Sequence, residues 1–318
     1  MTKLVMLCGI PGCGKSTFAN KLMREEEFIH LSSDGIREEI YGDENEQGNP
    51  KEVFEIMHSR MIENLKEGKS VIYDATNTSR KRRRHVLQLL KKIDCKKEIV
   101  YFNIGHRTAK ILDARRERQV GHHVIDRMYR TMQIPQRHEG WDSVKIVFYN
   151  TEGGSLATEE DINNLTFEGF KRILIDLELD DITIDRPQNN PYHNLSIDRH
   201  IYKVYEYIRE NYEGTFKEEL LWVALLHDVG KEHCRKTKDN LYDSFIGHEN
   251  VSAQLAMNRL IRLGRHDKEF ILRVVDLVNC HMLYLDESKL NKDKKEKGTD
   301  LFRVKMLETL RKADKAGH

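Results

Sequence analysis

The chain has 318 residues, enough for two domains of ordinary size, and its composition excludes several classes of protein. Hydrophobic residues make up 39% and charged residues 33%, which is typical of globular domains and not of a membrane-spanning or fibrous protein. The formal net charge of +1 argues against a general attraction to nucleic acid. Five cysteines without a C-x-x-C pair, and a strand-like N-terminus in place of a signal peptide, predict a reducing, cytoplasmic location.

The first expected elements are a short buried strand over residues 4–7 and a helix over residues 17–23. The loop between them, from Gly9 to Ser16, has the sequence GIPGCGKS, which fits the phosphate-binding pattern G-x-x-x-x-G-K-[ST]. In this strand–loop–helix setting the backbone N–H groups of the loop face an anion, and the lysine adds a positive charge. We therefore expect a nucleoside triphosphate and its Mg²⁺ to be bound by Gly12, Gly14, Lys15, Ser16 and Thr17.

Short apolar runs continue to alternate with helical patterns as far as residue 148. The runs lie at residues 28–31, 70–73, 99–104 and 144–148. This alternation predicts an α/β domain with a parallel sheet wrapped by helices. Ligands of such open sheets bind at the carboxyl ends of the strands. Because three of the expected strands end near Gly9, Asp34 and Asp74, we expect these residues to face one crevice.

Asp34, Arg37 and Asp74 are the residues that we expect to act at this crevice. Phosphoryl transfer needs positioned charge and a group that accepts the proton of the acceptor hydroxyl. Asp34 suits the second role, and Arg37, one helical turn later, would place an anion-binding guanidinium beside it. Asp74 is expected to support magnesium or to position the substrate. The alternative for each aspartate is that it only caps a helix.

A basic block, Arg80-Lys81-Arg82-Arg83-Arg84, opens the helix that follows Asp74. Such a charge run is commonly no more than a solvated helix face. Beside a nucleotide site it could equally guide a polyphosphate or the end of a nucleic acid. The sequence leaves both interpretations open.

The pattern changes after residue 150, where a turn-rich break over residues 151–155 precedes an acidic segment over residues 159–185. A connecting helix is expected near residues 167–179, and the sequence after residue 190 shows helix after helix without strand-like alternation. We therefore expect an α/β domain at residues 1–150, a linker at 151–187 and an all-α domain at 188–318.

Polar side chains on the buried faces of the later helices indicate a metal site. His227 and Asp228 directly follow the apolar run 220–226, while His281 and Asp314 each fall on the apolar face of a helix. A buried carboxylate is costly unless it is paired or bound to a metal. One buried histidine is commonly only hydrogen-bonded, but a set of such residues is better explained as ligands of one or two divalent metals. The set is His200, His227, Asp228, His248, His281 and Asp314.

The motifs of the first 150 residues resemble those of the 5′-polynucleotide kinases of phage and bacterial RNA repair. The matching motifs are the phosphate-binding loop, Ser33-Asp34-x-x-Arg37 and Asp74-Ala75-Thr76-Asn77. The resemblance implies that Asp34 is the general base that deprotonates a 5′-hydroxyl and that Arg37 holds a phosphate of the acceptor strand. It also implies that Asp74 and Asn77 help to shape the acceptor pocket.

The same kinase family has an arginine-bearing lid followed by the pattern V-P-x-x-V-[IL]-x-x-M, and residues 115–128 resemble it. Counting back from Val120, Arg115 matches the lid arginine that acts on the ATP phosphates. Gly121 stands where the pattern has proline, which loosens the register. Arg116 and Arg118 therefore remain alternatives to Arg115.

The order H…HD…H…H…D resembles that of the HD-domain metal phosphohydrolases, over residues 188–318. The stretches LLHDVGK at 225–231 and GHE at 247–249 are especially similar to the HD domain of bacterial CCA-adding enzymes, which acts on 2′,3′-cyclic phosphates and 2′-phosphates. The resemblance implies that Lys231 holds a phosphate oxygen. It also implies divalent metals such as Mn²⁺, Ni²⁺, Co²⁺ or Fe²⁺, the first held by His200, His227, Asp228 and Asp314 and a second by His248 and His281.

Kinase–HD fusions that heal RNA ends form a family, and this sequence resembles one with the kinase placed first. The resemblance implies a bifunctional enzyme that uses ATP and Mg²⁺ to phosphorylate 5′-hydroxyl ends and a metal to hydrolyse 2′,3′-cyclic phosphate or 2′-phosphate ends. The expected partners are RNA or DNA ends, a second copy of the chain and a separate ligase, with no membrane. Two alternatives stay open: a small-molecule P-loop kinase fused to an HD nucleotide phosphohydrolase, and a regulatory protein whose P-loop only senses ATP.

Overall fold

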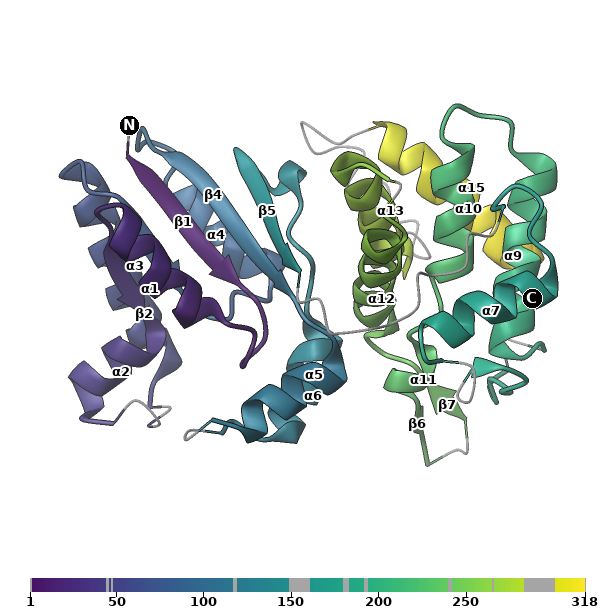
Figure 1. The fold of residues 1–318 in the computed structure, drawn as a ribbon, viewed down its shortest axis with the longest axis horizontal. Helices are drawn as coiled ribbons and strands as arrows, with labels where there is room; N and C mark the ends of the chain where they lie inside the picture. The colour runs from purple at the N-terminus through teal and green to yellow at the C-terminus, as the bar shows by residue number, and fades with distance from the viewer. Residues whose placement is uncertain are drawn as a thin grey trace. The chain divides into compact units, whose positions relative to one another are not determined.

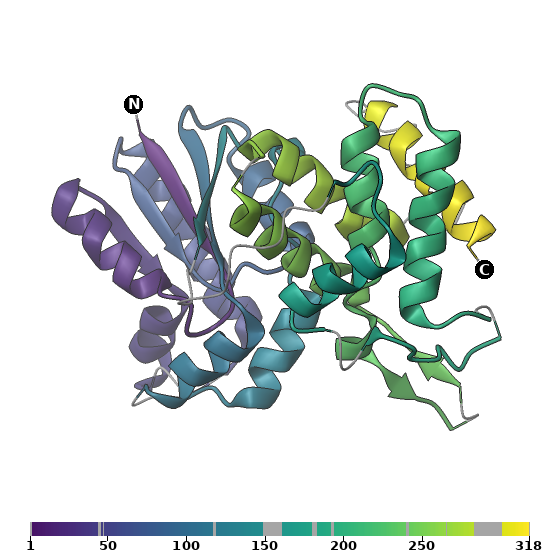
Figure 2. The ribbon, with the colours of Figure 1, turned by 45° about the vertical axis from the view of Figure 1, so that its right-hand side comes forward.

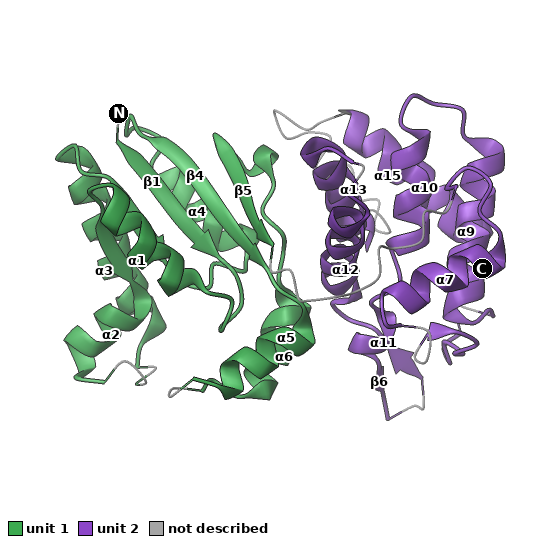
Figure 3. Cartoon of the chain, in the orientation of Figure 1, with its two compact units in different colours: residues 1–150 green, residues 151–318 purple. Residues whose placement is uncertain are grey.

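The chain forms two compact units, residues 1–150 and residues 151–318, shown in green and purple in Figure 3. The computed structural model describes residues 2–43, 46, 48–116, 119–148, 161–179, 183–191, 194–239, 242–264, 266–282 and 301–317. Within these ranges, no helix is both long enough and apolar enough to cross a membrane.

Unit 1 is built on a sheet of five parallel strands in the order β2-β3-β1-β4-β5 (Figure 1). The strands are β1 (Lys3–Cys8), β2 (Ile29–Ser32), β3 (Val71–Asp74), β4 (Lys96–Asn103) and β5 (Ser143–Phe148). Each strand coincides with one of the apolar runs in the sequence, so the predicted parallel α/β fold is confirmed. β1 and β3 lie inside the sheet and are almost entirely buried, which is why their sequences are continuously apolar and do not alternate.

Helices connect the strands of unit 1 and cover both faces of the sheet. They are α1 (Lys15–Glu25), α2 (Ser33–Tyr41), α3 (Pro50–Lys66), α4 (Arg80–Leu89), α5 (His106–Ala114) and α6 (His122–Thr131), followed by the 3₁₀ turn η1 (Arg137–Glu139). In Figure 1, α1 lies in front of the strands and α4 behind them. The rings of His58 in α3 and His85 in α4 are 5.4 Å apart, so these two helices are neighbours on one face.

The strand order brings three strand ends together at the carboxyl edge of the sheet. Asp74, the last residue of β3, is in register with Ser32 on β2 and with Leu7 on β1. Beyond the strands, the backbone N–H of Gly9 donates to the carbonyl of Thr76 at 3.0 Å. The segments that follow β1, β2 and β3 therefore start side by side at this edge, as the positions of Gly9, Asp34 and Asp74 in the sequence predict.

The described part of unit 2 is helical, as predicted, apart from one small hairpin. Its helices are α7 (Phe167–Asp176), α9 (Ile197–Asn211), α10 (Lys217–Leu226), α11 (Lys231–Cys234), α12 (His248–Leu263), α13 (Lys268–Cys280) and α15 (Leu301–Ala316). The antiparallel strands β6 (Lys236–Thr237) and β7 (Asp243–Ser244) form the hairpin. Residues 219–226 of α10 are all buried, which explains why this helix has no polar face.

Elements far apart in the sequence meet in unit 2. The C-terminal helix α15 lies against α9 in both views of the ribbon (Figures 1 and 2). Helix α7 also packs on α9: Phe170 and Ile173 are fully buried, and the hydroxyl of Tyr205 accepts the backbone N–H of Leu165 at 2.9 Å. The segment 151–187, expected as a linker, thus contributes a packed helix to the second unit.

Candidate functional site

The phosphate-binding loop of unit 1 adopts the geometry that its glycines permit. Gly12 and Gly14 have φ angles of 79° and 84°, a left-handed conformation that favours glycine. The loop ends where α1 begins at Lys15, so Ser16 and Thr17 occupy the exposed first turn of the helix. The Lys15 ammonium donates to the carbonyls of Gly9 and Ile10 at 3.0 and 2.9 Å and thereby stays over the loop. A helix N-terminus with a lysine above it is suited to bind an anionic phosphate chain.

Asp34 and Arg37 meet at the start of α2. Ser32 caps this helix by accepting the N–H of Gly35 at 2.8 Å, so capping does not require Asp34. The guanidinium of Arg37 donates to Asp34 Oδ1 at 2.8 Å. The Asp34 side chain is half exposed, whereas that of Arg37 is largely buried. A solvent-facing carboxylate is therefore held by a fixed cation at the sheet edge.

Asp74 is the buried acid of the same edge. Its carboxylate lies 3.2 Å from Nε2 of His30, and only 6% of the residue is exposed. His30 was not predicted as a site residue, because it is one polar position on a strand and its relation to Asp74 depends on the pairing of β2 with β3. The position of Asp74, between the phosphate-binding loop and α2, allows it to act on either the donor or the acceptor side.

Asn77 and Arg83 brace the loop after β3 from within. The amide of Asn77 donates to the carbonyls of Leu7 and Ala75, so its two N–H groups are used inside the domain and not at the sheet edge. Arg83 is fully buried, pairs with Glu139 at 2.6 and 2.8 Å, and donates to the Asn77 carbonyl at 2.9 Å. Arg83 must therefore be removed from the basic block considered as a phosphate guide. Arg80 also lies 3.5 Å from Glu139, so the exposed members of the block are Lys81, Arg82 and Arg84.

The expected lid corresponds to the hairpin of α5 and α6. Asp113, which is buried near the end of α5, accepts the N–H groups of Val120 and Gly121 at 3.2 and 3.1 Å. Gly121 has φ 87° and ψ 150°, a region that is essentially restricted to glycine. Proline could neither adopt this φ nor donate to Asp113. The departure from the family pattern at Gly121 is thus a requirement of this turn.

Two of the three arginines proposed for the lid, Arg115 and Arg116, directly follow the C-terminal end of α5. Arg115 and Arg116 are both exposed, and Arg116 is 3.8 Å from Asp113. Arg118 lies outside the described residues. The Asp113 contact directs Arg116 toward the base of the turn, whereas Arg115 is exposed and has no ion pair among the described residues.

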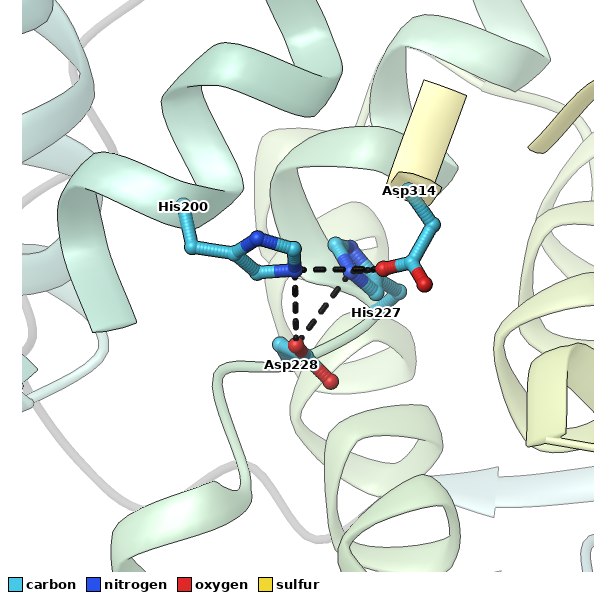
Figure 4. Close-up of side chains that lie close together, drawn as sticks. All are labelled: His200, His227, Asp228 and Asp314. Carbon is cyan, nitrogen blue, oxygen red and sulfur yellow. Dashed lines mark hydrogen bonds and ion pairs between the residues drawn. The ribbon is translucent and has the colours of Figure 1, made fainter. Parts of the chain in front are cut away.

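In unit 2, four of the six predicted metal ligands converge from two helices and the end of a third (Figure 4). They are His200 on α9, His227 and Asp228 after α10, and Asp314 on α15. One ligand atom from each lies within 4.8 Å of all the others. Nε2 of His200 is 3.1 Å from Asp314 Oδ1 and 3.4 Å from Asp228 Oδ2.

The other two predicted ligands form a second group around the same aspartate. Nε2 of His248 and Nε2 of His281 lie 3.0 and 3.5 Å from Asp228 Oδ1. The first group approaches Oδ2 of that carboxylate. Asp228 therefore belongs to both groups, with one oxygen facing each, so each group could hold one divalent ion with Asp228 as the shared residue.

The histidine orientations fit a divalent metal. Nδ1 of each ring faces a backbone carbonyl: Gly317 for His200, Ala224 for His227, Phe245 for His248 and Val278 for His281, at 2.7 to 3.2 Å. Because a carbonyl only accepts, each Nδ1 carries the proton and each Nε2 of a neutral ring presents a lone pair. Nε2 of His248 and His281 are 3.1 Å apart, so two lone pairs face each other unless a cation lies between them. Nε2 of His227 is buried without a hydrogen bond.

Charges within this cluster are strongly coupled. Burial opposes a charge on His227, but the carboxylates of Asp228 and Asp314 raise its pKa to about 10. Burial also opposes a charge on Asp228, yet His227 and Lys231 hold the pKa of this carboxyl well below its usual range. His281 differs, because burial lowers its pKa. In the metal-free protein a proton on His227 therefore partly replaces the positive charge that the acids require.

Lys231 lies directly against the cluster and is only 4% exposed. Its ammonium is 2.6 Å from Asp228 Oδ2 and donates to Oε1 of the buried Gln188 at 2.7 Å. The position is compatible with the predicted contact to a phosphate oxygen. Gln188 was not predicted, since a lone glutamine gives no signal in the sequence and its partner is 43 residues away.

Comparisons with known proteins match each unit separately. Residues 4–135 match a family model described as AAA domain, and residues 197–309 match one described as HD domain. L-seryl-tRNA(Sec) kinase of Methanococcus maripaludis is 29% identical over 157 residues, which cover 47% of this chain and 60% of that protein. The chain thus spans about three fifths of the length of that relative.

Among solved structures, one described as the Pnkp1/Rnl/Hen1 complex is 26% identical over 38% of this chain and 40% of the matched chain, with a TM-score of 0.32. The two family matches coincide with the parallel sheet of unit 1 and with the helices that hold the histidine–aspartate cluster. Unit 1 is therefore similar to an AAA domain over residues 4–135, and unit 2 is similar to an HD domain over residues 197–309.

Proposed function

We propose that the chain is an RNA end-healing enzyme in which unit 1 phosphorylates 5′-hydroxyl ends and unit 2 hydrolyses 2′,3′-cyclic phosphate or 2′-phosphate ends. The observation that carries the kinase half is the pair of Asp34 and Arg37 beside the phosphate-binding loop. Asp34 would accept the proton of the attacking hydroxyl, and Arg37 would bind the phosphate next to that hydroxyl. Lys15, with Ser16 and Thr17, would hold the triphosphate of ATP, and Arg115 would reach its phosphates from the α5–α6 hairpin.

The hydrolase half rests on the shared carboxylate of Asp228. The six ligands named above would hold one or two divalent ions, which when bound supply Lewis acid chemistry for phosphate ester hydrolysis. Backbone carbonyls keep the four histidine rings in the orientation that this binding needs. Lys231 would neutralise a phosphate oxygen of the substrate, and Gln188 would hold the lysine in place.

The test is a single RNA substrate that carries a 5′-hydroxyl and a 2′,3′-cyclic phosphate, incubated with ATP, Mg²⁺ and Mn²⁺. Both ends should change, and absence of any change at either end would refute the proposal. Asp34→Ala should lower 5′ phosphorylation about 100- to 10,000-fold, because a general base contributes that much, and should leave 3′-end hydrolysis intact. Asp228→Ala should do the opposite. Loss of both activities from either substitution would contradict two separable sites.

A second candidate is a kinase for another acceptor, fused to an HD nucleotide phosphohydrolase. This candidate is favoured by the similarity of the chain to L-seryl-tRNA(Sec) kinase. The name of that protein indicates that its acceptor is a hydroxyl group other than the 5′ end of a polynucleotide. Competition decides between the two candidates. If a nucleoside, a sugar or an aminoacyl-tRNA outcompetes 5′-hydroxyl RNA for phosphorylation, the second candidate is correct.

A further inference from the structure

The outer surface of α3 and α4 carries rings and cations that neither site uses. Phe54 and His58 lie on α3, and Arg82 and His85 lie on α4. The Arg82 guanidinium lies 5.7 Å from the centre of the Phe54 ring. The His58 ring is 6.3 Å from Phe54 and 5.4 Å from His85. We call these four residues the α3–α4 platform.

The platform is anchored to the core through His58. His58 stacks on the ring of Tyr73, with 13° between the planes and 6.1 Å between the centres. Tyr73 belongs to β3 and is 1% exposed. The contacts therefore form a continuous path of rings from the sheet outward to His85, which is exposed. Rings fixed in this way lose little conformational entropy when a ligand stacks on them.

The platform is positively charged. Lys81, Arg82 and Arg84 are exposed on α4, and none of them has a carboxylate partner among the described residues. The nearest acid on α3, Glu55, pairs with Lys51 at 3.7 Å. Arg83 turns inward, whereas Lys81, Arg82 and Arg84 are exposed to solvent, and Arg82 lies directly against a ring of the platform.

The position of the platform connects it to the acceptor end of unit 1. Helix α4 begins six residues after Asp74, and α3 leads into the opposite end of β3, so both helices start at the carboxyl edge of the sheet. Phe54 and Arg82 lie in the first turns of their helices. A strand whose 5′ end is bound at Asp34 would leave the site along this edge.

We propose that the α3–α4 platform binds the unpaired nucleotides that follow the 5′ end of the acceptor, an inference that rests on the proposed kinase function. Nucleobases stack on aromatic rings and on guanidinium planes, while the backbone phosphates contact the surrounding cations. A surface with rings alone would suit an apolar partner, and a surface with cations alone would suit any acidic partner. The alternation of the two kinds of group favours a single-stranded nucleic acid.

The test compares long and short acceptors. The KM for phosphorylation of a 5′-hydroxyl RNA of twelve nucleotides is divided by the KM for a dinucleotide, in the wild-type protein and in the Arg82→Ala/His85→Ala double variant. Loss of one stacked base should raise this ratio about 5- to 150-fold. Lys91→Ala, which removes an exposed cation just beyond the other end of α4, should leave the ratio unchanged. Arg82→Lys keeps the positive charge but loses the planar guanidinium on which a base can stack, so it should give an intermediate KM ratio.

The outcomes separate the two proposals. A wild-type protein that phosphorylates neither RNA refutes the kinase function itself. A wild-type protein that phosphorylates both, with the same KM ratio in the double variant, overturns the platform alone. Fluorescence anisotropy with the same labelled RNA supplies a second measurement without chemistry, and thermal unfolding confirms that each variant is folded. Equal competition by polyglutamate of matched charge would instead assign the surface to an acidic protein.

Discussion

Arg83→Ala tests whether one arginine of the basic block holds the acceptor side of unit 1 together. Arg83 is completely buried, makes two hydrogen bonds to Glu139, and donates to the carbonyls of Asn77 and Thr78 at 2.9 and 3.1 Å. Alanine removes both of these hydrogen bonds from the buried Glu139 carboxylate and leaves Arg80, 3.5 Å away, as its remaining charge partner. Breaking such a buried pair costs about 3 to 5 kcal/mol of unfolding free energy. For a unit of this size that corresponds to a fall in Tm of roughly 6 to 20 °C.

The matched control is Arg84→Ala, which removes the next arginine of the same block. Arg84 is exposed and has no ion pair among the described residues, so its loss should change the unfolding free energy by no more than about 0.5 kcal/mol. Nothing in the sequence distinguishes the two arginines, whereas in the tertiary structure Arg83 is buried and Arg84 is exposed. A simple solvated face would give equal and small effects for both.

The chain offers a specific assay for unit 1. It has two tryptophans, Trp141 in unit 1 and Trp222 in unit 2. Trp141 is buried and donates to Glu139 at 3.2 Å, so its fluorescence reports on the pair itself. Urea unfolding would be measured in a Trp222→Phe background. If Arg83→Ala lies within about 1 kcal/mol of Arg84→Ala, a difference well below the expected cost of a broken buried pair, the reasoning is refuted.

Three further predictions address the other features. Gly121→Pro should destabilise unit 1 by at least about 1 kcal/mol and lower kinase activity, because proline cannot reach φ 87° or donate to Asp113; an unfolding curve that matches the wild type would contradict this. Asp228→Asn should abolish binding of both divalent ions, whereas His281→Ala should remove only one; elemental analysis after dialysis measures the stoichiometry, and equal losses would argue against a shared carboxylate. The third prediction concerns chelator-treated protein, in which protonated His227 has a folded-state pKa of about 10. The stability that this proton contributes is fully present below the unfolded-state pKa of the histidine and is lost as the pH rises through about 10. His227→Gln should therefore reduce the fall in unfolding free energy that is measured between pH 7 and pH 10.

The sequence by itself determined which residues are candidates for the chemistry of each unit. The backbone N–H groups and the lysine of the phosphate-binding loop lie within one contiguous segment, Gly9 to Ser16, so the sequence alone shows that they act together. Asp34 and Arg37 are one helical turn apart, so their contact also followed from local geometry. The buried strands of the parallel sheet and the helical second half followed from the apolar patterns, because burial on both faces of a parallel sheet leaves continuous apolar runs.

Only the tertiary structure decided which of these residues share a site and in what role. Asp228 divides its two oxygens between His200 and His248 because α9 and α12 converge on it, a fact that no spacing encodes. The partners Gln188 and His30 depend on contacts 43 and 44 residues apart. Arg83 and Arg84 are identical neighbours in the sequence, yet one is buried and the other exposed. Their difference is set by the direction in which a helix presents each side chain to the rest of the fold.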